Sequence, residues 1–396
     1  MNFTNADNVQ TVTMEASAAV NQLTLNNVKN TAGTHALNYR GDGLNAANEL
    51  YDTLVYVAGD ATGSGSTLAI NVHNRGVVLT DGTYSHQPGA FTANGFESVS
   101  ITVADGDCTF ATGSGSTELQ SLSLTASHDL TLGTVTGGDS PAANKSVTSI
   151  NASNVAGNLS ATFHDVGDFA SVTLGGGADI VSIGEGNSAG ANASLYGGAG
   201  NDVLTGTNQA DFIYGEAGND QITGDGGGDT IAGGAGSDTF IIAVAADGGD
   251  TYSDFDWGGG ANNDNLDFQV AALSIDGTVT DFAGATVTAL PADTAMATNA
   301  VIFQCAEQIA ASTAATAVAN AVTQLADGGT DVASAVGLAA NDSFLFIMND
   351  GTNYFIFHYL ASAAGGGIAV TDANDLTLLG VFSGLDGANA AAADFL

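Results

Sequence analysis

Five aspartates recur at a constant interval of nine residues between residues 197 and 241. They are Asp202, Asp211, Asp220, Asp229 and Asp238. The same stretch holds seven acidic residues and no basic residue, so its carboxylates need a cation from outside the chain. Ca²⁺ takes six to eight oxygen ligands, including carboxylates and main-chain carbonyls. The spacing therefore predicts calcium binding along this stretch.

Glycines and large apolar residues share the nine-residue period. The glycines are Gly197, Gly206, Gly215, Gly224 and Gly233, and the apolar residues are Leu204, Ile213, Ile222, Ile231 and Phe240. Six residues of turn and three of strand make half a coil, so residues 18 apart should stack on one edge. This places Asp202, Asp220 and Asp238 on one edge and Asp211 and Asp229 on the other. The apolar residues should point inward, and metal binding should drive folding.

The repeat resembles the nonapeptide GGxGxDxUx of the RTX family, which forms a calcium-binding parallel β-roll. Residues 197–205 and 233–241 match at every position, whereas Thr207 and Gln209 stand where glycines are expected. Glu216 and Asp225 replace the second glycine of their repeats. The resemblance implies metal-site residues Gly197, Gly198, Gly200, Asp202, Gly206, Asp211, Gly215, Gly218, Asp220, Gly224, Gly227, Asp229, Gly233, Gly234, Gly236 and Asp238.

A weaker copy of the repeat precedes these units at residues 174–182, with Asp179 at the sixth position. Asp179 is a further candidate ligand, although Gly and Asp also favour ordinary solvated turns and that alternative stays open here. For 197–241 turn preference alone does not explain a fixed period. After the weak copy, Ser188 stands where the next aspartate would fall.

Charge and composition exclude several partner classes. The 396 residues include 42 acidic and 4 basic ones, and the formal net charge is −38. The basic residues are Lys29, Arg40, Arg75 and Lys145. Nucleic-acid binding needs clustered Lys and Arg, so we expect none. No apolar run approaches 18 residues, so we expect no membrane insertion. A hydrophobic content of 44% is enough for a folded core.

The rest of the chain is predicted to be mostly β-structure, which makes the fold class all-β. Residues 1–170 alternate apolar and Ser/Thr/Asn positions, as in a Ser/Thr-rich solenoid or sandwich, and we favour the solenoid. Residues 171–241 form the predicted β-roll. In 242–396, the segments 250–256 and 265–268 resemble the RTX roll cap, about 294–326 suggests one or two helices, and 343–357 reads as a hairpin followed by a strand at 376–381.

Catalytic signatures are weak in this sequence. None of the six histidines (His35, His73, His86, His128, His164 and His358) precedes a Glu, which excludes the HExxH zinc helix. A GxSxG around Ser188 lacks the strand and helix of a nucleophile elbow, so we treat it as a chance match. Cys108 has no cationic neighbour in sequence, and with Cys305 it could make at most one disulfide bond. Arg40-Gly41-Asp42 is interpreted as an ordinary loop. We expect no enzyme activity.

RTX repeats, scarce Lys and Arg, and Ser/Thr-rich strands together resemble bacterial surface-layer (S-layer) proteins exported by type I systems. The final residues, ending Ala393-Asp394-Phe395-Leu396, resemble an uncleaved C-terminal export signal, and no N-terminal signal is recognised. The expectation is a secreted, calcium-dependent protein that assembles with itself in a cell-surface lattice, with cell-surface polysaccharide as a candidate further partner. The alternative is an RTX adhesin or extracellular filament subunit. A secreted enzyme ranks third.

Overall fold

The structure is a computed structural model of the 396-residue chain. It describes residues 11–16, 22–28, 34–41, 53–58, 67–73, 77–78, 84–86, 91–94, 96–110, 114–115, 119–137, 147–164, 166–184, 192–242, 249–257, 263–268, 273–275, 278–280, 287–290, 302–308, 316, 343–360 and 376–383. The chain forms two compact units. Unit 1 comprises residues 1–209 and 215–217, and unit 2 comprises 210–214 and 218–396. The division falls within strand β20 (Phe212–Ala217).

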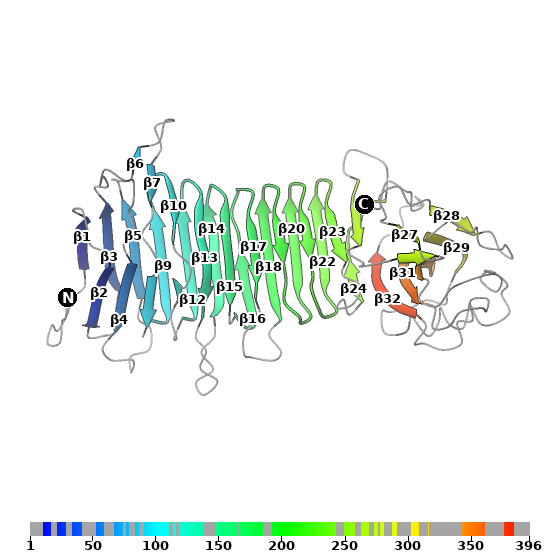
Figure 1. The fold of residues 1–396 in the computed structure, drawn as a ribbon, viewed down its shortest axis with the longest axis horizontal. Helices are drawn as coiled ribbons and strands as arrows, with labels where there is room; N and C mark the ends of the chain where they lie inside the picture. Colours follow the sequence, from blue (N-terminus) through cyan, green and yellow to red (C-terminus); the bar gives the residue numbers. More distant parts are fainter. Residues whose placement is uncertain are drawn as a thin grey trace. The chain divides into compact units, whose positions relative to one another are not determined.

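Unit 1 is built from two parallel sheets (Figure 1). The first runs in the order β1 (Thr11–Ala16), β3 (Thr34–Gly41), β5 (Thr67–His73), β9 (Ser98–Val103), β12 (Ser121–Ala126), β14 (Val147–Val155), β16 (Val166–Thr173) and β18 (Ala193–Ala199). The second runs β2 (Gln22–Val28), β4 (Thr53–Ala58), β8 (Phe91–Asn94), β11 (Ser114–Gly115), β13 (Leu130–Thr136), β15 (Leu159–His164), β17 (Ile180–Ile183) and β19 (Val203–Thr205). Three short strands lie beside this path: β6 (Val77–Val78), β7 (Tyr84–His86) and β10 (Asp107–Thr109).

Most successive strands of unit 1 alternate between the two sheets, so each coil gives one strand to each. Pairing along both sheets is parallel, as in β5 with β9 and β13 with β15. Antiparallel pairing would be expected of a sandwich of hairpins and Greek keys. The solenoid prediction for the N-terminal region is therefore confirmed.

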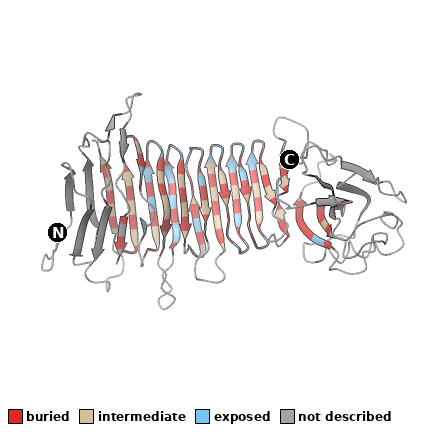
Figure 2. Cartoon of the chain, in the orientation of Figure 1, coloured by how far each residue is buried: buried red, intermediate tan, exposed pale blue. Residues whose placement is uncertain are grey.

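The alternating sequence explains why these segments form half-buried strands. In β9, Val99, Ile101 and Val103 are buried, while the intervening Ser and Thr residues are partly exposed. β12 repeats the pattern with Leu122 and Leu124. Figure 2 shows the resulting alternation of buried and more exposed residues along the strands. A period of two places every second side chain in the core between the sheets.

Unit 2 contains parallel coils followed by antiparallel strands. Its larger sheet includes, in order, β22 (Thr230–Ala235), β24 (Asp250–Tyr252), β32 (Leu376–Ser383), β31 (Asn353–Leu360), β30 (Ser343–Asn349), β29 (Ile302–Gln308) and β28 (Val287–Leu290). Its smaller sheet includes β21 (Gln221–Thr223), β23 (Thr239–Ile242) and β25 (Asn265–Phe268), and β26 (Leu273–Ile275) pairs with β27 (Thr278–Thr280). β30, β31 and β32 pair antiparallel, which confirms the predicted hairpin and the strand after it.

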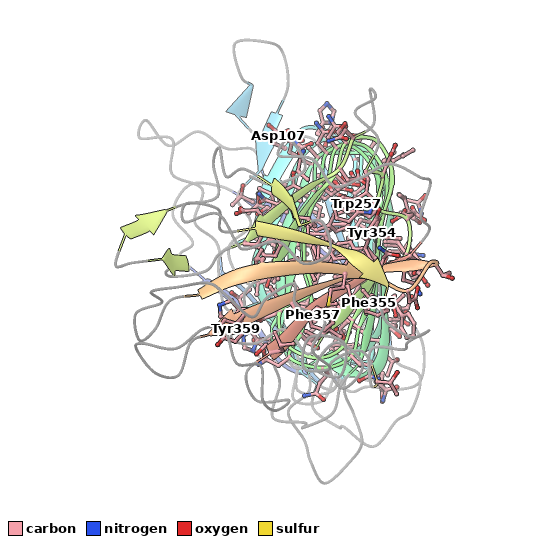
Figure 3. All side chains as sticks on the ribbon, turned by 90° about the vertical axis from the view of Figure 1, so that its right-hand side faces the viewer. Asp107, Trp257, Tyr354, Phe355, Phe357 and Tyr359 are labelled. Atoms are coloured by element: carbon pink, nitrogen blue, oxygen red, sulfur yellow. The ribbon has the colours of Figure 1, made fainter. Side chains whose placement is uncertain are left out.

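The segments expected to cap the roll add one more coil in unit 2. β24 pairs in parallel with β22, and β25 pairs in parallel with β23. An aromatic cluster then packs beside this coil: the rings of Tyr252 and Phe382 stack at 4.5 Å, and those of Trp257 and Tyr354 lie 5.3 Å apart. Figure 3 shows Trp257 and Tyr354 close together. Large buried rings shield the apolar end of the parallel coils from water.

The helix prediction for about 294–326 is wrong at residues 302–308. These residues form β29, which pairs in parallel with β28 on one side and β30 on the other. Backbone pairing on both edges overrides the local helical preference of this Ala-containing stretch. Thr316 is helical, and the remainder of the predicted helical region lies outside the described residues, as do Ser188 and residues 384–396.

Candidate metal centre

All six predicted aspartates are buried at the entrance to a strand. Asp179 has 0% of its surface exposed, and the other five are 1–2% exposed. Each immediately precedes a strand, and the second residue of that strand is a buried apolar one, such as Val181 after Asp179 or Leu204 after Asp202. The eighth-position residues Leu204, Ile213, Ile222, Ile231 and Phe240 are 0–1% exposed, as predicted. Buried carboxylates require compensation, so their partners define the site.

In unit 1, the carboxylates link successive coils by hydrogen bonds to the main chain. The N–H of Leu159 donates to Oδ1 of Asp179 at 2.7 Å, and the N–H of Asp179 donates to Oδ1 of Asp202 at 2.8 Å. Each carboxylate therefore satisfies a main-chain donor of the coil before its own. One oxygen of each group is used for this purpose.

Two rows with the same pattern occur in unit 2. In the first, Oδ1 of Asp229 accepts from Asp211 N at 2.7 Å, and Oδ1 of Asp250 accepts from Asp229 N at 2.9 Å. In the second, Oδ1 of Asp238 accepts from Asp220 N at 2.8 Å, and Oδ1 of Asp264 accepts from Asp238 N at 2.9 Å. Asp211 thus stacks on Asp229, and Asp220 stacks on Asp238. This is the 18-residue spacing that the repeat predicted.

Sequence reasoning missed Asp250 and Asp264, which end these two rows. They are 1% and 3% exposed. They escaped the period because they follow the preceding aspartate of their row by 21 and 26 residues, according to the same hydrogen bonds. A local signal was present, because Asp250-Thr251-Tyr252 and Asp264-Asn265-Leu266 keep the order of Asp, any residue, and a buried apolar residue.

The turns between the strands require two different left-handed positions. At the second repeat position, Gly198 and Gly234 have φ of 98° and 100°, and Glu216 and Asp225 adopt φ of 74° and 71°. At the fourth position φ lies between 133° and 148°, and the residues there are Gly200, Gly218, Gly227 and Gly236. Side chains tolerate the αL region but hardly the larger values. Acidic residues can therefore replace the second glycine but not the fourth.

The turn at 206–211 is built differently. Of the described non-glycine residues only Glu216 and Asp225 have positive φ, so Thr207 and Gln209 do not reproduce the glycine turn. Thr207 is 5% exposed, and its Oγ1 accepts the N–H of Gln209 at 3.1 Å. The turn that begins at Gly206 therefore differs in backbone conformation from the other turns of the repeat.

The first glycine of a repeat makes room for the aspartate of the same repeat. A Cβ on Gly197 would lie 2.6 Å from Oδ2 of Asp202, and one on Gly233 would collide with Oδ2 of Asp238. A Cβ on Gly200 would collide with the carbonyl oxygen of Gly177 in the neighbouring coil. Carboxylate and carbonyl oxygens therefore gather in the turns, where glycine leaves space for them.

One carboxylate oxygen in these turns has unused acceptor capacity. Oδ2 of Asp238 is buried and has no hydrogen-bond partner among the described residues. Within the described part of the chain, no three His, Cys, Asp or Glu side chains form a metal-binding group. A cation here would be held by single carboxylate oxygens together with main-chain carbonyls. That all-oxygen donor set fits Ca²⁺ and is unsuited to softer metals.

The electrostatics of the rows also favour a cation. Burial raises the pKa of Asp179 and of Asp250 to about 6, and that of Asp264 to about 7. Burial likewise raises the pKa of Asp238. The ionised carboxylates are therefore penalised when no cation is near, and a divalent ion would reverse this penalty.

The other candidate residues form no comparable site in the described parts. Burial raises the pKa of the Cys108 thiol, which keeps it protonated, and lowers the pKa of His358. Nδ1 of His128 lies 3.1 Å from Gly106 N and 2.8 Å from Ser127 Oγ. No helix among the described residues has the length and hydropathy needed to cross a membrane.

Comparison with known proteins identifies the repeat. A family model described as the RTX calcium-binding nonapeptide repeat, in four copies, matches residues 196–231 and 205–240. No curated protein matches the chain significantly. The chain contains RTX nonapeptide repeats, and such repeats bind Ca²⁺. The matched residues include the aspartates from Asp202 to Asp238, whereas Asp179, Asp250 and Asp264 lie outside them.

Proposed function

We propose that this RTX protein is a calcium-dependent structural component of a bacterial cell surface, which assembles with copies of itself into an S-layer lattice. The observation that carries the proposal is the set of buried carboxylate rows in a chain of formal charge −38. Copies with this charge repel one another, and every bound Ca²⁺ removes two negative charges and can bridge carboxylates across a contact. Calcium thus couples folding to association.

The extracellular location follows from the same chemistry. Extracellular calcium-binding modules work at roughly 0.1–1 mM Ca²⁺, far above cytosolic levels. The carboxylate rows would therefore stay metal-free inside the cell and fill outside. RTX-repeat proteins are typically exported by type I secretion, which fits this order of events.

No catalytic role is part of the proposal. Carboxylates and carbonyls that gather in glycine turns serve as cation ligands, and the Cys108 thiol is held in its protonated, unreactive form. A screen of the purified protein with peptide, ester and glycoside substrates tests this point, and calcium-dependent turnover of any of them would contradict it.

An adhesin or filament subunit is the second candidate, and the outer face of the unit 1 solenoid favours it. Ser123 and Thr125 of β12 are exposed, and Ser121 Oγ donates to Ser98 Oγ at 2.8 Å on the same face. Neutral hydroxyl rows on a strongly acidic protein suit a neutral, hydroxyl-rich partner such as a polysaccharide. Cell-surface polysaccharide is accordingly a candidate partner for either function.

Scattering and electron microscopy with and without Ca²⁺ test the proposal. Millimolar Ca²⁺ should produce ordered two-dimensional sheets, and EGTA should dissolve them. Filaments in place of sheets would favour the second candidate. A protein that stays monodisperse throughout the titration would contradict both assembly forms. Mg²⁺ at equal concentration is the control, because it demands a tighter octahedral shell and keeps its waters.

A further inference from the structure

In unit 1, Asp179 and Asp202 occupy positions that are filled by apolar or neutral residues in the earlier coils. The register pairs Cys108 with Leu130 and Leu130 with Leu159. Ser160 pairs with Ile180, and Ile180 pairs with Val203. The residue before each of these is Leu159, Asp179 or Asp202, so these three residues also occupy equivalent positions in successive coils. The corner row is therefore Cys108, Leu130, Leu159, Asp179 and Asp202.

The environment of the corner row stays constant while its chemistry changes. All five residues are buried, with 0–1% of their surface exposed. The first three are apolar or neutral, and the last two are carboxylic acids. In Leu130 and Leu159 the side chain itself fills the corner with apolar surface, which stabilises the coil in water alone. In Asp179 and Asp202 the same corner holds a charge that burial disfavours.

The backbone hydrogen bonds change at the same point. The N–H of Cys108 donates to the carbonyl of Asp129 at 2.9 Å, and that of Leu130 to the carbonyl of Asn158 at 2.8 Å. From Leu159 onward the acceptor is a carboxylate, because its N–H donates to Oδ1 of Asp179. In the earlier coils the N–H of the corner residue therefore donates to a main-chain carbonyl, whereas from Leu159 onward it donates to the carboxylate of an aspartate.

The acidic residues beside the apolar corners do not share this burial. Oδ1 of Asp107 accepts from Asp129 N at 3.3 Å, and Oδ1 of Asp129 accepts from Asn158 N at 2.8 Å. Asp129 and Asn158 are exposed and Asp107 is half-buried. Their charge or amide group reaches water, so this ladder needs no metal.

We propose that Ca²⁺ takes the place of the apolar corner side chains from Asp179 onward, and that the boundary between calcium-independent and calcium-dependent folding lies between Leu159 and Asp179. Coils up to β15 fold without the ion and present β15 as a ready edge. β17 and the following coils fold onto that edge when calcium fills the corners. The inference rests on calcium binding and goes beyond the proposed lattice, which it does not require.

Hydrogen exchange of the full chain at monomeric concentration tests the boundary. In EGTA the amides of β13 and β15 should stay protected, whereas those of β17 and β19 should exchange rapidly. Calcium at one hundred times its dissociation constant should slow exchange in β17 and β19 by about 100-fold, the factor that the ligand adds to the opening equilibrium. Loss of protection in β15 together with β19 in EGTA, or equal protection of β15 and β17 there, would overturn the proposal.

Reciprocal variants move the boundary in opposite directions. Asp179→Leu extends the apolar row and removes a buried charge, although it also removes the acceptor of the Leu159 N–H. β17 should therefore become protected in EGTA. Leu159→Asp shortens it, so β15 should lose protection in EGTA while β13 keeps it. Asp179→Asn is the isosteric control, because it retains an acceptor for Leu159 N–H and removes the charge. It should protect β17 in EGTA relative to the wild type.

These measurements separate the inference from the other claims. If Asp179→Leu fails to fold, β13 will lose protection in calcium as well. The boundary is then tested by the exchange pattern of the wild type and of the Asp179→Asn variant. A protein that never assembles but shows the boundary would contradict the lattice alone. If calcium changes the exchange of no amide, the carboxylate rows do not bind the ion under these conditions and the inference fails.

Discussion

Replacing Asp238 by asparagine should distinguish the contribution of cation binding to stability from that of the hydrogen bond that the Asp238 carboxylate accepts. Asp238 is 1% exposed, its Oδ1 accepts the N–H of Asp220 at 2.8 Å, and its Oδ2 has no hydrogen-bond partner among the described residues. Asp238→Asn keeps an oxygen for the Asp220 N–H and removes the charge. Asp238→Ala removes both, which leaves a buried donor unsatisfied at a cost of about 1–3 kcal/mol.

The change in melting temperature caused by Asp238→Asn should have opposite signs in EGTA and in calcium. At pH 8 in EGTA the asparagine variant should melt at or above the wild-type temperature, because burial raises the pKa of Asp238 and so penalises its ionised form. In calcium at one hundred times its dissociation constant, loss of one site removes about 2.7 kcal/mol. For a unit of this size that corresponds to a melting temperature lower by about 5–10 °C.

Differential scanning calorimetry measures both effects, and isothermal titration calorimetry counts the ions. The matched control is Asp267→Asn, since Asp267 lies in β25 with the same charge but is half-exposed and belongs to no carboxylate row. The control should leave melting in calcium within about 2 °C of the wild type, because a substitution away from the carboxylate rows usually changes stability by no more than about 0.5 kcal/mol. Equal melting of the Asp238→Asn variant and the wild type in calcium, with unchanged stoichiometry, would refute the role of Asp238 as a ligand.

Three further predictions concern pH, a turn and the repeat as a whole. Burial gives Asp250 and Asp264 folded-state pKa values of about 6 and 7 against a usual value of 3.8, so the folded metal-free protein binds more protons than the unfolded chain between about pH 4 and 7. Its melting temperature in EGTA should therefore fall as pH rises through this window, and saturating calcium should reverse the slope; a flat EGTA profile would contradict the burial of these charges. Gly236→Ala should destabilise the fold by more than about 1 kcal/mol in urea titrations, because φ is 145° and its Cβ would collide with the carbonyl of Gly218, and a neutral result would contradict the turn geometry. Replacing Asp220 and Asp229 together by alanine should lower the number of bound ions and the calcium-dependent gain in melting temperature, and an unchanged ion count would show that these two carboxylates are not ligands.

The candidate site was largely predictable because its determinants are local. A nine-residue unit carries its own turn, its own carboxylate and its own inward residue, as Gly233, Asp238 and Phe240 illustrate. Departures such as Glu216 were visible in the sequence, but only the backbone showed that a φ of 74° accommodates an acidic side chain.

The fold was less completely predictable where strand partners lie far apart in sequence. Alternation in β9 and β12 fixes the buried face but does not choose between a parallel and an antiparallel neighbour. In β29, partners from β28 and β30 decide for strand over helix. Asp250 and Asp264 were missed because longer connections interrupt the period before them, although the corner they reach is the same.

The sequence by itself determined the chemistry of the repeat: the nine-residue period sets glycine, aspartate and apolar residue at fixed positions, and a calcium-binding β-roll follows. Only the tertiary structure decided where that chemistry begins. Leu159 and Asp179 are 20 residues apart and Leu130 and Leu159 are 29 apart, so no constant period connects them. Register between parallel strands places them in one corner row, because backbone hydrogen bonding aligns coils of unequal length. That shared corner, filled by leucine in one coil and by a carboxylate in the next, exists only in the folded chain.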